Sequence, residues 1–337
     1  GCSDTYTRSI VVQDVTAGFR AAPDPVCMLE NVQFTNTSVV EAASATYLWT
    51  FGDGVTSTAR NPIHAYGQAG NYTARLTVTV PAGCVDTYSD VIQVEDVSAS
   101  FNLAPSPVCV GTPVVFTDTS LYVAPSGVTY AWSFGDGGTS TLRNPTHPYT
   151  TAGQYTVTLT VTTVEAGCSD VYTRLVRVED VTASFTAGPD PACAAETVYF
   201  TNTSSIVAFG SVSYLWQFSD GWTSTEASPH HAFSQAGTYP VTLTVSSAGG
   251  CSDSYTSVID VEDVTANFTT SGNPVCVGEP VLFTDTSVVE PLAGATYLWQ
   301  FGDGATSTDR NATHAYATTG DFLVRLTVTT AGAGCVD

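Results

Sequence analysis

Four histidines recur at one place in a repeated motif, and each follows an aspartate with which it could carry out acid–base chemistry. The histidines are His64, His147, His231 and His314, each eleven residues after the Asp of a short turn. Such a pair becomes catalytic when it activates a serine or cysteine nucleophile, but no nucleophile repeats beside these residues. A residue found in every copy of a repeat more often belongs to the framework. We therefore predict structural hydrogen bonding, no catalytic activity and no organic cofactor.

Acidic pairs form a second candidate set for chemistry. They recur in Val-Glu-Asp-Val segments, as Glu95 and Asp96, Glu179 and Asp180, and Glu262 and Asp263. Calcium needs six to eight oxygen ligands, and adjacent side chains of a strand point to opposite faces. Another loop would have to contribute, for which Asp86, Asp170, Asp253 and Asp337 are candidates. Two interpretations stay open: solvated carboxylates, or a calcium ion that stiffens each junction.

An aromatic strand is the element that must position the histidine and its aspartate. Tyr, Trp and Phe alternate with other residues, which is the period of a half-buried strand, and a Gly-Asp-Gly turn follows. The strand occurs four times, with tryptophans that step by 83, 84 and 83 residues: Trp49, Trp132, Trp216 and Trp299. A long alternating strand follows each histidine, and no long window has the apolar period of a helix. This regularity predicts an all-β tandem array.

The repeated motifs resemble those of the PKD domain, an immunoglobulin-like module. The residues that carry the resemblance are Phe-Thr-Asn/Asp-Thr-Ser, Trp-x-Phe-Gly-Asp-Gly, Pro-x-His-x-Tyr and Gly-x-Tyr-x-Val-x-Leu-x-Val, and they cover nearly all of the chain. The resemblance implies a seven-stranded β-sandwich per copy, with the four tryptophans between its two sheets. It also implies a non-catalytic spacer, adhesion or surface-layer role, and some PKD-like modules bind calcium.

The repeat sets the expected domain boundaries. Residues 1–14 match the last strand of a module, and four modules follow: module 1 at 15–96, module 2 at 97–180, module 3 at 181–263 and module 4 at 264–337, the last without its final strand. No Gly- or Ser-rich linker separates them, which favours a stiff rod. Both ends read Gly-Cys-x-Asp, so we expect a window of a longer array or one subunit of a fibre. Module 4 should be completed by continuing chain or by residues 5–13 of a neighbouring subunit.

The composition restricts the class of protein. The net charge is −22, with only 12% charged residues and no lysine, which argues against binding to a nucleic-acid backbone. No apolar run is long enough for a membrane span. Nine cysteines recur singly at fixed places without Cys-x-x-Cys, which indicates disulfides in an oxidising compartment rather than zinc. We therefore expect an extracellular or cell-surface location.

Two disulfide pairings fit the PKD-like sandwich. Pairs within modules would be Cys27–Cys84, Cys109–Cys168, Cys193–Cys251 and Cys276–Cys335. In an immunoglobulin-like sandwich, however, the first cysteine of a module lies near its exit pole and the second near its entry pole, too far apart for a bond. That implication favours a staggered ladder between successive modules, with both alternatives open. The ladder pairs are Cys27–Cys168, Cys109–Cys251 and Cys193–Cys335.

Three surface features remain as candidate contact sites. In module 3, Trp222 occupies a place held by Val55, Gly138 and Ala305, and we expect it to be mostly exposed and able to stack on a sugar or anchor a protein. Asn71 and Asn311 are the better candidates among five glycosylation sequons. The loop after Phe-Thr-Asn/Asp-Thr-Ser is apolar in every copy, and either packs on its own module or on a neighbour.

The sequence thus favours a structural extracellular array that forms a stiff rod or surface fibre. Its expected partners are further copies, head-to-tail or lateral, with glycans as a further candidate class. One alternative is an adhesin with a carbohydrate or protein contact in module 3. The other is the spacer array of a secreted hydrolase.

Overall fold

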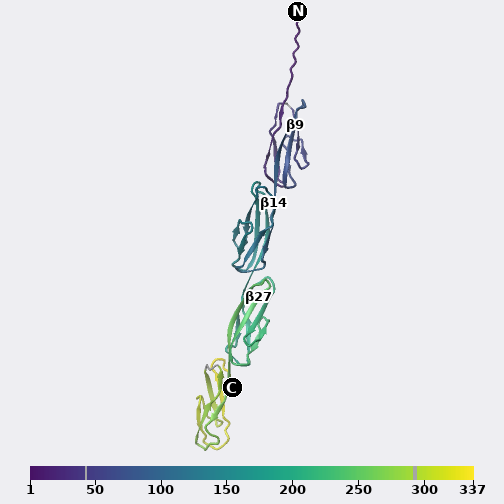
Figure 1. Cartoon of the computed structure of the whole chain (residues 1–337). Coiled ribbons are helices and arrows are strands. Elements are labelled where there is room, and N and C mark those ends of the chain that lie inside the picture. Colours follow the sequence, from purple (N-terminus) through teal and green to yellow (C-terminus); the bar gives the residue numbers. More distant parts are fainter. Residues whose placement is uncertain (42–43, 291–293) are drawn as a thin grey trace. The chain divides into compact units, whose positions relative to one another are not determined.

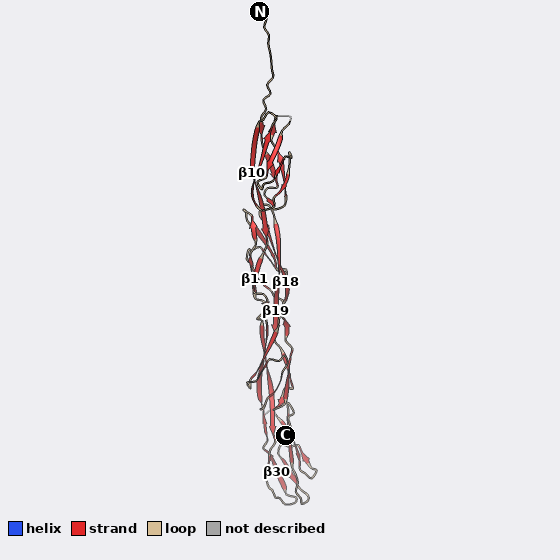
Figure 2. Cartoon of the chain, turned by 90° about the vertical axis from the view of Figure 1, so that its right-hand side faces the viewer, coloured by secondary structure: helices blue, strands red, loops and turns tan. Residues whose placement is uncertain are grey.

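The computed structural model describes residues 1–41, 44–290 and 294–337, and in these ranges every regular element is a β-strand (Figures 1 and 2). The chain divides into two compact units. The first unit comprises residues 1–106, 111–150 and 154–177, and therefore holds module 1 and most of module 2. The second comprises residues 107–110, 151–153 and 178–337.

Module 1 is a sandwich of two antiparallel sheets. One sheet has the order β2-β4-β8, and in the other β10 pairs with β9, β9 with β6 and β6 with β7, while β3 runs parallel to β10. The strands are β1 (Val15–Thr16), β2 (Phe19–Ala22), β3 (Val26–Cys27), β4 (Asn31–Asn36), β5 (Val39–Val40), β6 (Thr46–Thr50), β7 (Thr56–Ser57), β8 (Ile63–Ala65), β9 (Gly70–Thr79) and β10 (Val85–Ser98).

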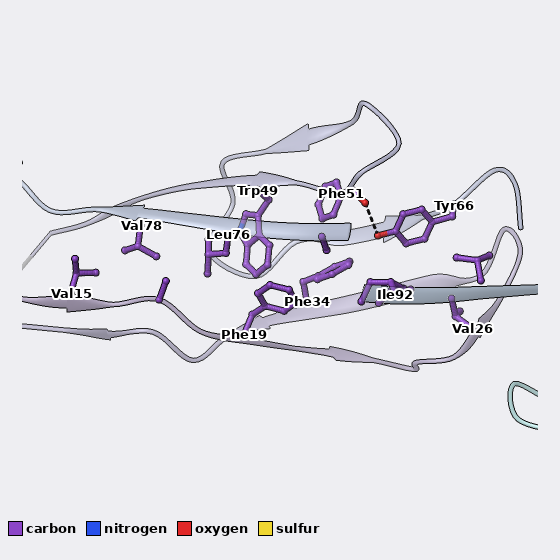
Figure 3. Close-up of a cluster of buried hydrophobic side chains, with 14 of the residues drawn as sticks. Val15, Phe19, Val26, Phe34, Trp49, Phe51, Tyr66, Leu76, Val78 and Ile92 are labelled. Carbon is purple, nitrogen blue, oxygen red and sulfur yellow. Dashed lines mark hydrogen bonds between the residues drawn. The ribbon is translucent and has the colours of Figure 1, made fainter. Parts of the chain in front are cut away.

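The core of module 1 lies between these sheets, as Figure 3 shows. The Trp49 ring meets Phe19 and Phe34 edge-on, at centroid distances of 5.1 and 5.6 Å. Its indole N–H donates to the carbonyl of Ala59 at 2.9 Å, so burial leaves no polar atom of the ring without a partner. Trp132, Trp216 and Trp299 are buried in the same way in modules 2, 3 and 4.

The turn after the aromatic strand explains its glycine. Gly52 has a φ of 91°, and a Cβ there would lie 2.8 Å from the backbone oxygen of Thr73. Glycine therefore allows the left-handed conformation and the close approach of β9. Gly135 and Gly302 are constrained in the same way. In module 3, Ser219 takes this place without a positive φ, and β24 continues one residue further, through Phe218.

Modules 2 and 3 repeat the arrangement. The sheets β11-β13-β17 and β20-β22-β26 correspond to β2-β4-β8, and β15 pairs with β16 and β18 as β24 pairs with β25 and β27. The strands are β11 (Phe101–Ala104), β12 (Val108–Cys109), β13 (Pro113–Asp118), β14 (Leu121–Val123), β15 (Val128–Ser133), β16 (Thr139–Ser140), β17 (Thr146–Pro148), β18 (Gly153–Thr163), β19 (Ser169–Thr182), β20 (Phe185–Gly188), β21 (Ala192–Cys193), β22 (Thr197–Asn202), β23 (Ser205–Val207), β24 (Val212–Phe218), β25 (Thr223–Ser224), β26 (His230–Ala232), β27 (Gly237–Ser247) and β28 (Ser252–Thr265).

Module 4 has the sheet β29-β30-β34 and a shorter second sheet, β33-β32-β35. The described part of the chain contains no strand on the other side of β35, apart from a single bridge between Thr329 and Val336. The strands are β29 (Phe268–Thr270), β30 (Pro280–Asp285), β31 (Val288–Glu290), β32 (Ala295–Gln300), β33 (Thr306–Ser307), β34 (Ala312–Ala315) and β35 (Arg325–Thr330).

The apolar loops are short strands of their own modules. β5, β14, β23 and β31 pair antiparallel with the first strand segment of the module that contains them, for example Leu121–Val123 with Asp96–Ser98. Their outward side chains stay exposed, including Val39 and Leu121. Of the two interpretations of these loops, the structure has the one in which each lies on its own module.

Residues 1–14 form no strand and lie at the N-terminal end of the trace in Figure 1. Their strand-like apolar side chains are exposed, with Ile10 at 85% and Val12 at 82%. The assignment of this segment as the last strand of a preceding module stays a prediction.

The joint between modules as candidate functional site

Each joint is built on one continuous strand. β10, β19 and β28 each have 14 residues. The first ten residues of β10 pair with β9 of module 1, and its last three, Asp96–Ser98, pair with β14 of module 2. β28 serves modules 3 and 4 in the same way, pairing with β27 and then with β31. One strand therefore closes a module and opens the next.

A disulfide crosses beside each of these strands. The bonds are Cys27–Cys168, Cys109–Cys251 and Cys193–Cys335, each with Cα atoms 5.5 Å apart. These are the pairs of the staggered ladder, and the intramodule pairs do not occur. Cys27 is placed for its bond by β3, which runs parallel to β10 at Val94 and Glu95. Cys2, Cys84 and Cys276 are free.

The joint glutamates are buried, which corrects the interpretation of these acids as solvated. Glu95 and Glu179 are 0% exposed and Glu262 is 6% exposed. The Glu95 carboxylate accepts the N–H of Ala166 at 3.1 Å and the amide of Gln93 at 3.0 Å. Glu262 accepts the N–H of Ala333 at 2.7 Å. Each carboxylate thus binds the turn that carries the cysteine of the next module, and its burial is offset by charge-assisted hydrogen bonds.

Glu179 makes the corresponding contact with two hydrogen-bond donors and a closely packed glycine turn. Its carboxylate accepts the N–H of Phe209 at 2.9 Å and the hydroxyl of Ser247. The turn lies so close that a Cβ on Gly249 would overlap with the carboxylate and with the ring of Pro107. Gly332 lies against Glu262 and Pro191 in the same way. Glycine at these two places therefore allows the turn to pack directly on the buried acid.

The aspartates proposed as further calcium ligands accept backbone hydrogen bonds. Asp86, Asp170, Asp253 and Asp337 accept the N–H of Ala17, Ala99, Ala183 and Ala266, all at 2.7–2.8 Å. The neighbours Asp180 and Asp263 are exposed. Within the described ranges, no group of three or more His, Cys, Asp or Glu side chains is placed to hold a metal ion.

The four histidines bind their turn aspartates, as the framework interpretation expects. In each module the ring Nε2 lies 2.6–2.7 Å from the Oδ2 of the aspartate. His64 also stacks on Phe51 at 4.2 Å, over the end of the core. Partial burial alone would raise the pKa of Asp53, but the N–H of Val55 and the His64 ring outweigh it and lower this pKa. For Asp303, the N–H of Ala305 and then His314 lower the pKa.

A second charged contact distinguishes modules 2 and 4. Asp118 and Asp285 accept hydrogen bonds from Arg143 and Arg310, each at 3.0 Å. Burial alone would raise the pKa of Asp118, but donors on Ser120, Arg143 and Tyr130 lower it. Burial, together with the bond donated to Asp118, raises the pKa of Tyr130 to about 12. Asn36 and Asn202 stand in the aspartate position in modules 1 and 3, and Arg60 and Ala227 stand in the arginine position of these modules.

Trp222 is less free than the sequence indicates. It is 37% exposed, because one face of its indole stacks on His231 with a centroid distance of 4.5 Å and an interplanar angle of 6°. Its backbone N–H is held by Asp220 at 3.1 Å. The stack replaces the His–Phe stack of the other modules, since Phe218 is tilted by 53° to His231. Trp222 is thus a fixed aromatic plate on the surface of module 3.

The two glycosylation candidates differ in their surroundings. Asn71 is exposed at the start of β9. Asn311 is exposed as well, but its amide oxygen accepts the N–H of Asp285 at 2.9 Å, just as Asn61 and Asn144 accept from Asn36 and Asp118. The side chain of Asn311 is therefore part of the framework of its module.

Sequence reasoning missed the joint glutamates, although a signal was present. Glu95 and Val97 are two residues apart, so their side chains point to the same face of the strand, and both are buried. Val94 points to the opposite face and is buried as well. Two successive buried residues, Val94 and Glu95, break the alternation expected of a strand that faces one core. The break marks the point where the strand leaves one sandwich and enters the next.

The chain belongs to the PKD domain family. The family model for the PKD domain matches residues 17–95, 99–179, 182–262 and 265–337. These segments agree with the four modules to within a few residues and cover nearly the whole chain.

Curated relatives are similar to parts of this chain. The chain is 35% identical over 127 residues to the pre-pro-metalloprotease PrtV of Vibrio cholerae, covering 38% of this chain and 14% of the relative. It is 26% identical over 315 residues to human polycystin-1, covering 86% of this chain and 7% of the relative. Collagenase ColA of Bacillus cereus is 49% identical over 51 residues, which are 14% of this chain and 5% of the relative. The chain thus spans less than a sixth of the length of these relatives.

Two solved structures are similar to parts of the chain. The PKD1 domain of Vibrio anguillarum Epp is 35% identical, with 24% of this chain and 94% of that chain covered and a TM-score of 0.22. The titin I-band fragment I67-I69 is 14% identical, with 75% and 99% covered and a TM-score of 0.44. In the ranges that the structure describes, no helix is long and apolar enough to span a membrane.

Proposed function

We propose that this chain is a structural, non-catalytic array that keeps modules at fixed distances outside the cell, as part of a stiff rod or surface fibre. The joint carries the proposal. One continuous strand, one disulfide and one buried glutamate act in parallel at each junction, so bending would have to break a sheet register, strain a covalent bond and expose a buried charge together.

The extracellular location is supported by the chemistry of the joint. Structural disulfides, of which the described residues contain three, are typical of an oxidising compartment. The relatives named as a pre-pro-metalloprotease and collagenases fit this location. The non-catalytic role is supported by the fourfold repetition of the Asp–His pair, which has nearly the same Nε2–Oδ2 distance in every module. In modules 1, 2 and 4 the histidine also stacks on a core phenylalanine.

Small-angle X-ray scattering tests the stiffness of the joints. We expect the oxidised chain to keep the distance between its first and last modules nearly constant, so that the distance distribution shows a well-defined maximum dimension. Replacing both cysteines of Cys27–Cys168 with serine should broaden that distribution, and replacing all six bonded cysteines should broaden it further. A Cys2→Ser variant is the control, since Cys2 is free. Scattering curves that do not change when all three bonds are removed would contradict the proposal.

A second function is favoured by Trp222. Its indole stacks on His231 and stays 37% exposed, as a plate that stacks on a sugar ring or anchors an aromatic contact. On this basis the chain is an adhesin that binds through module 3. A glycan array with the whole chain and a Trp222→Ala variant tests it: binding that survives the substitution excludes this plate as the contact.

The third function is that of a spacer in a secreted hydrolase, which is supported by the protease and collagenase relatives. The full reading frame separates it from the other two, because a catalytic domain would lie outside the four modules. A hydrolase screen of the present chain should be negative in all three cases. Turnover that is lost in His231→Ala would overturn the non-catalytic assignment.

A further inference from the structure

A groove lies at the open side of module 4, beside β35. A cavity of about 600 Å³ is lined by side chains that include Cys276, Val281, Phe283, Tyr316, Phe322 and Val324. In modules 1 and 3 the corresponding region is closed by the apolar residues Ile92 and Val94 of β10, and Ile259 and Val261 of β28. Residues 321–324 form no strand, whereas β9 and β27 begin at the equivalent glycines, Gly70 and Gly237.

The chain itself contains a segment with the required residue pattern. Asp4, Tyr6, Ile10 and Val12 repeat Asp86, Tyr88, Ile92 and Val94 of β10 at the same spacing. In the structure this segment is extended away from any sheet, with Tyr6 88% and Ile10 85% exposed. An extended segment that leaves both an apolar row and its backbone groups unpaired is a ready partner for an open sheet edge.

The start of module 1 also carries half of a joint. The Sγ of Cys84 lies 3.4 Å from the carbonyl oxygen of Gln13, as the Sγ of Cys168 lies 3.8 Å from that of Glu95. The N–H of Ala82 donates to the side-chain oxygen of Gln13 at 3.3 Å, as that of Ala166 donates to Glu95 at 3.1 Å. Gln13 and Cys84 thus stand where Glu95 and Cys168 stand in a complete joint.

Module 4 carries the complementary half. Cys276 is free and exposed, and it corresponds to Cys27, Cys109 and Cys193, which are all bonded. The N–H of Gly278 donates to the carbonyl of Tyr316 at 2.9 Å, as Gly111 donates to Tyr149 at 2.8 Å, so the turn that presents the cysteine is already formed. The cysteine of module 4 is therefore positioned like the cysteines of the joined modules.

We propose that residues 5–13 of a second copy of this chain bind in the groove of module 4, and that Cys276 then forms a disulfide with Cys84 of that copy. The proposal deepens the proposed array by naming the joint between copies, and it rests on that function. The register follows from β10 and β9, in which Ile92 pairs with Tyr72 and Tyr88 with Leu76. Ile10 should accordingly lie opposite Phe322, and Tyr6 opposite Leu326.

Asp337 defines where the incoming strand begins. Its N–H and carbonyl already pair with Val328, and its carboxylate accepts the N–H of Ala266. It therefore occupies the place that Asp4 of the second copy would take, so pairing starts at Thr5. Cys335 is already bonded to Cys193, which leaves Cys2 of the second copy without a role in the joint.

The covalent step is an ordinary thiol oxidation. The thiols of Cys84 and Cys276 lose two protons and two electrons as the S–S bond forms, and oxidised glutathione accepts them and becomes two molecules of reduced glutathione. The bond forms only after docking, because the two sulfur atoms belong to different copies and must be brought within bonding distance.

The test uses the purified full chain in a buffer of reduced and oxidised glutathione, followed by non-reducing electrophoresis and peptide mapping. We expect a ladder of multimers linked through Cys84–Cys276. Cys276→Ser should abolish the ladder, whereas Cys2→Ser should leave it unchanged. Multimers linked through Cys2, or a chain that stays monomeric at high concentration, would overturn the proposal.

A matched pair of substitutions tests the strand itself. Ile10→Asp places a charge on the inward row and should reduce the yield of multimers at least about tenfold, as an unpaired charge at a buried site costs several kcal/mol. Val11→Asp is the control, because its position corresponds to the outward Gln93 and Asp260, which already include a charge. Residues 1–14 belong to no sheet in the structure, so neither variant disturbs the folding of a module.

Hydrogen exchange gives an independent readout. On assembly, amides of Phe322–Arg325 should become protected, and a synthetic peptide of residues 4–15 should protect them in a chain that carries Ile10→Asp. Equal yields for Ile10→Asp and Val11→Asp, or no protection by the peptide, would rule the groove out as the acceptor. The stiffness of the joints within one copy is measured separately by scattering, so failure here is distinguishable from failure of the array.

Discussion

Modules 1 and 4 carry the same motifs, yet their cores are closed to different extents. In module 1, Tyr66 is 1% exposed and Phe19 is buried, and β10 contributes the buried side chains of Ile92 and Val94 to the core. In module 4, the equivalents Tyr316 and Phe268 are only partly buried, and the groove opens beside Tyr316. The difference teaches that the strand that completes a module is also the strand that starts its neighbour. The core of a module and its joint to the next one are therefore a single structure.

The largest effect is expected at the tryptophans, where the two modules should behave alike. Trp49 and Trp299 are both 0% exposed and both meet two phenylalanines. Replacing either with alanine should cost its module about 3–5 kcal/mol, because a large cavity forms. Hydrogen exchange of the amides of β9 and β35 reports each module separately. A much smaller loss for Trp299→Ala would mean that the core of module 4 is loose throughout, and not only beside the groove.

The next substitution should make module 1 resemble module 4. Ile92→Ala removes an apolar side chain from the closing strand and should cost about 2–5 kcal/mol, with the loss confined to amides of module 1. Val91→Ala is the matched control on the same strand, since Val91 is 51% exposed, and should change stability by less than about 0.5 kcal/mol. Equal effects of the two substitutions would refute the role given to the closing strand.

The joints beside modules 1 and 4 share a buried glutamate, Glu95 in one and Glu262 in the other. Glu262→Ala leaves the buried N–H of Ala333 without its carboxylate and should destabilise module 4 by about 1.5–3 kcal/mol. Glu262→Gln keeps an acceptor and should cost less. Urea denaturation followed by exchange at residues near Cys335 measures both. The carboxylate has no part in the joint if Glu262→Ala leaves these amides as protected as in the parent chain.

The smallest difference between modules 1 and 4 is expected in their stability at acid pH. In both, the turn aspartate has a pKa below its ordinary value: for Asp53, the N–H of Val55 and the His64 ring outweigh the opposing effect of burial, and for Asp303, the N–H of Ala305 acts first and His314 second. A carboxyl with a lowered folded-state pKa stabilises the fold fully above its unfolded pKa of about 3.9, and this stabilisation is lost as the pH falls through the folded pKa.

A pH titration monitored by exchange measures this loss. Module 4 should open at a higher pH than module 1 below about pH 4, because its incomplete core leaves less stability in reserve. Asp53→Asn and Asp303→Asn should flatten the acid response of the module that carries them. The comparison fails if module 1 opens first, or if neither substitution changes the profile.

Much of the site could be predicted from particular residues. The Asp–His pairs, the buried tryptophans and the repeat boundaries follow from local periodicity and turn chemistry. The disulfides needed the polarity of the sandwich, since the sequence offers equally regular pairings within and between modules. The hydrogen bond of Glu95 with Ala166, the stacking of Trp222 on His231 and the pairing of β14 with β10 could not be predicted, because each depends on which residues meet in the folded chain.

By itself, the sequence determined a tandem all-β array, its module length, its family and the aromatic core, since these depend on spacing within one repeat. The tertiary structure alone decided how modules are joined. A carboxylate in Val-Glu-Asp-Val has no fixed environment until the turn of the following module lies beside it, some seventy residues later in the chain. Only then do the donors of that turn make burial of the charge favourable, and the same acid changes from a surface group to the centre of the joint.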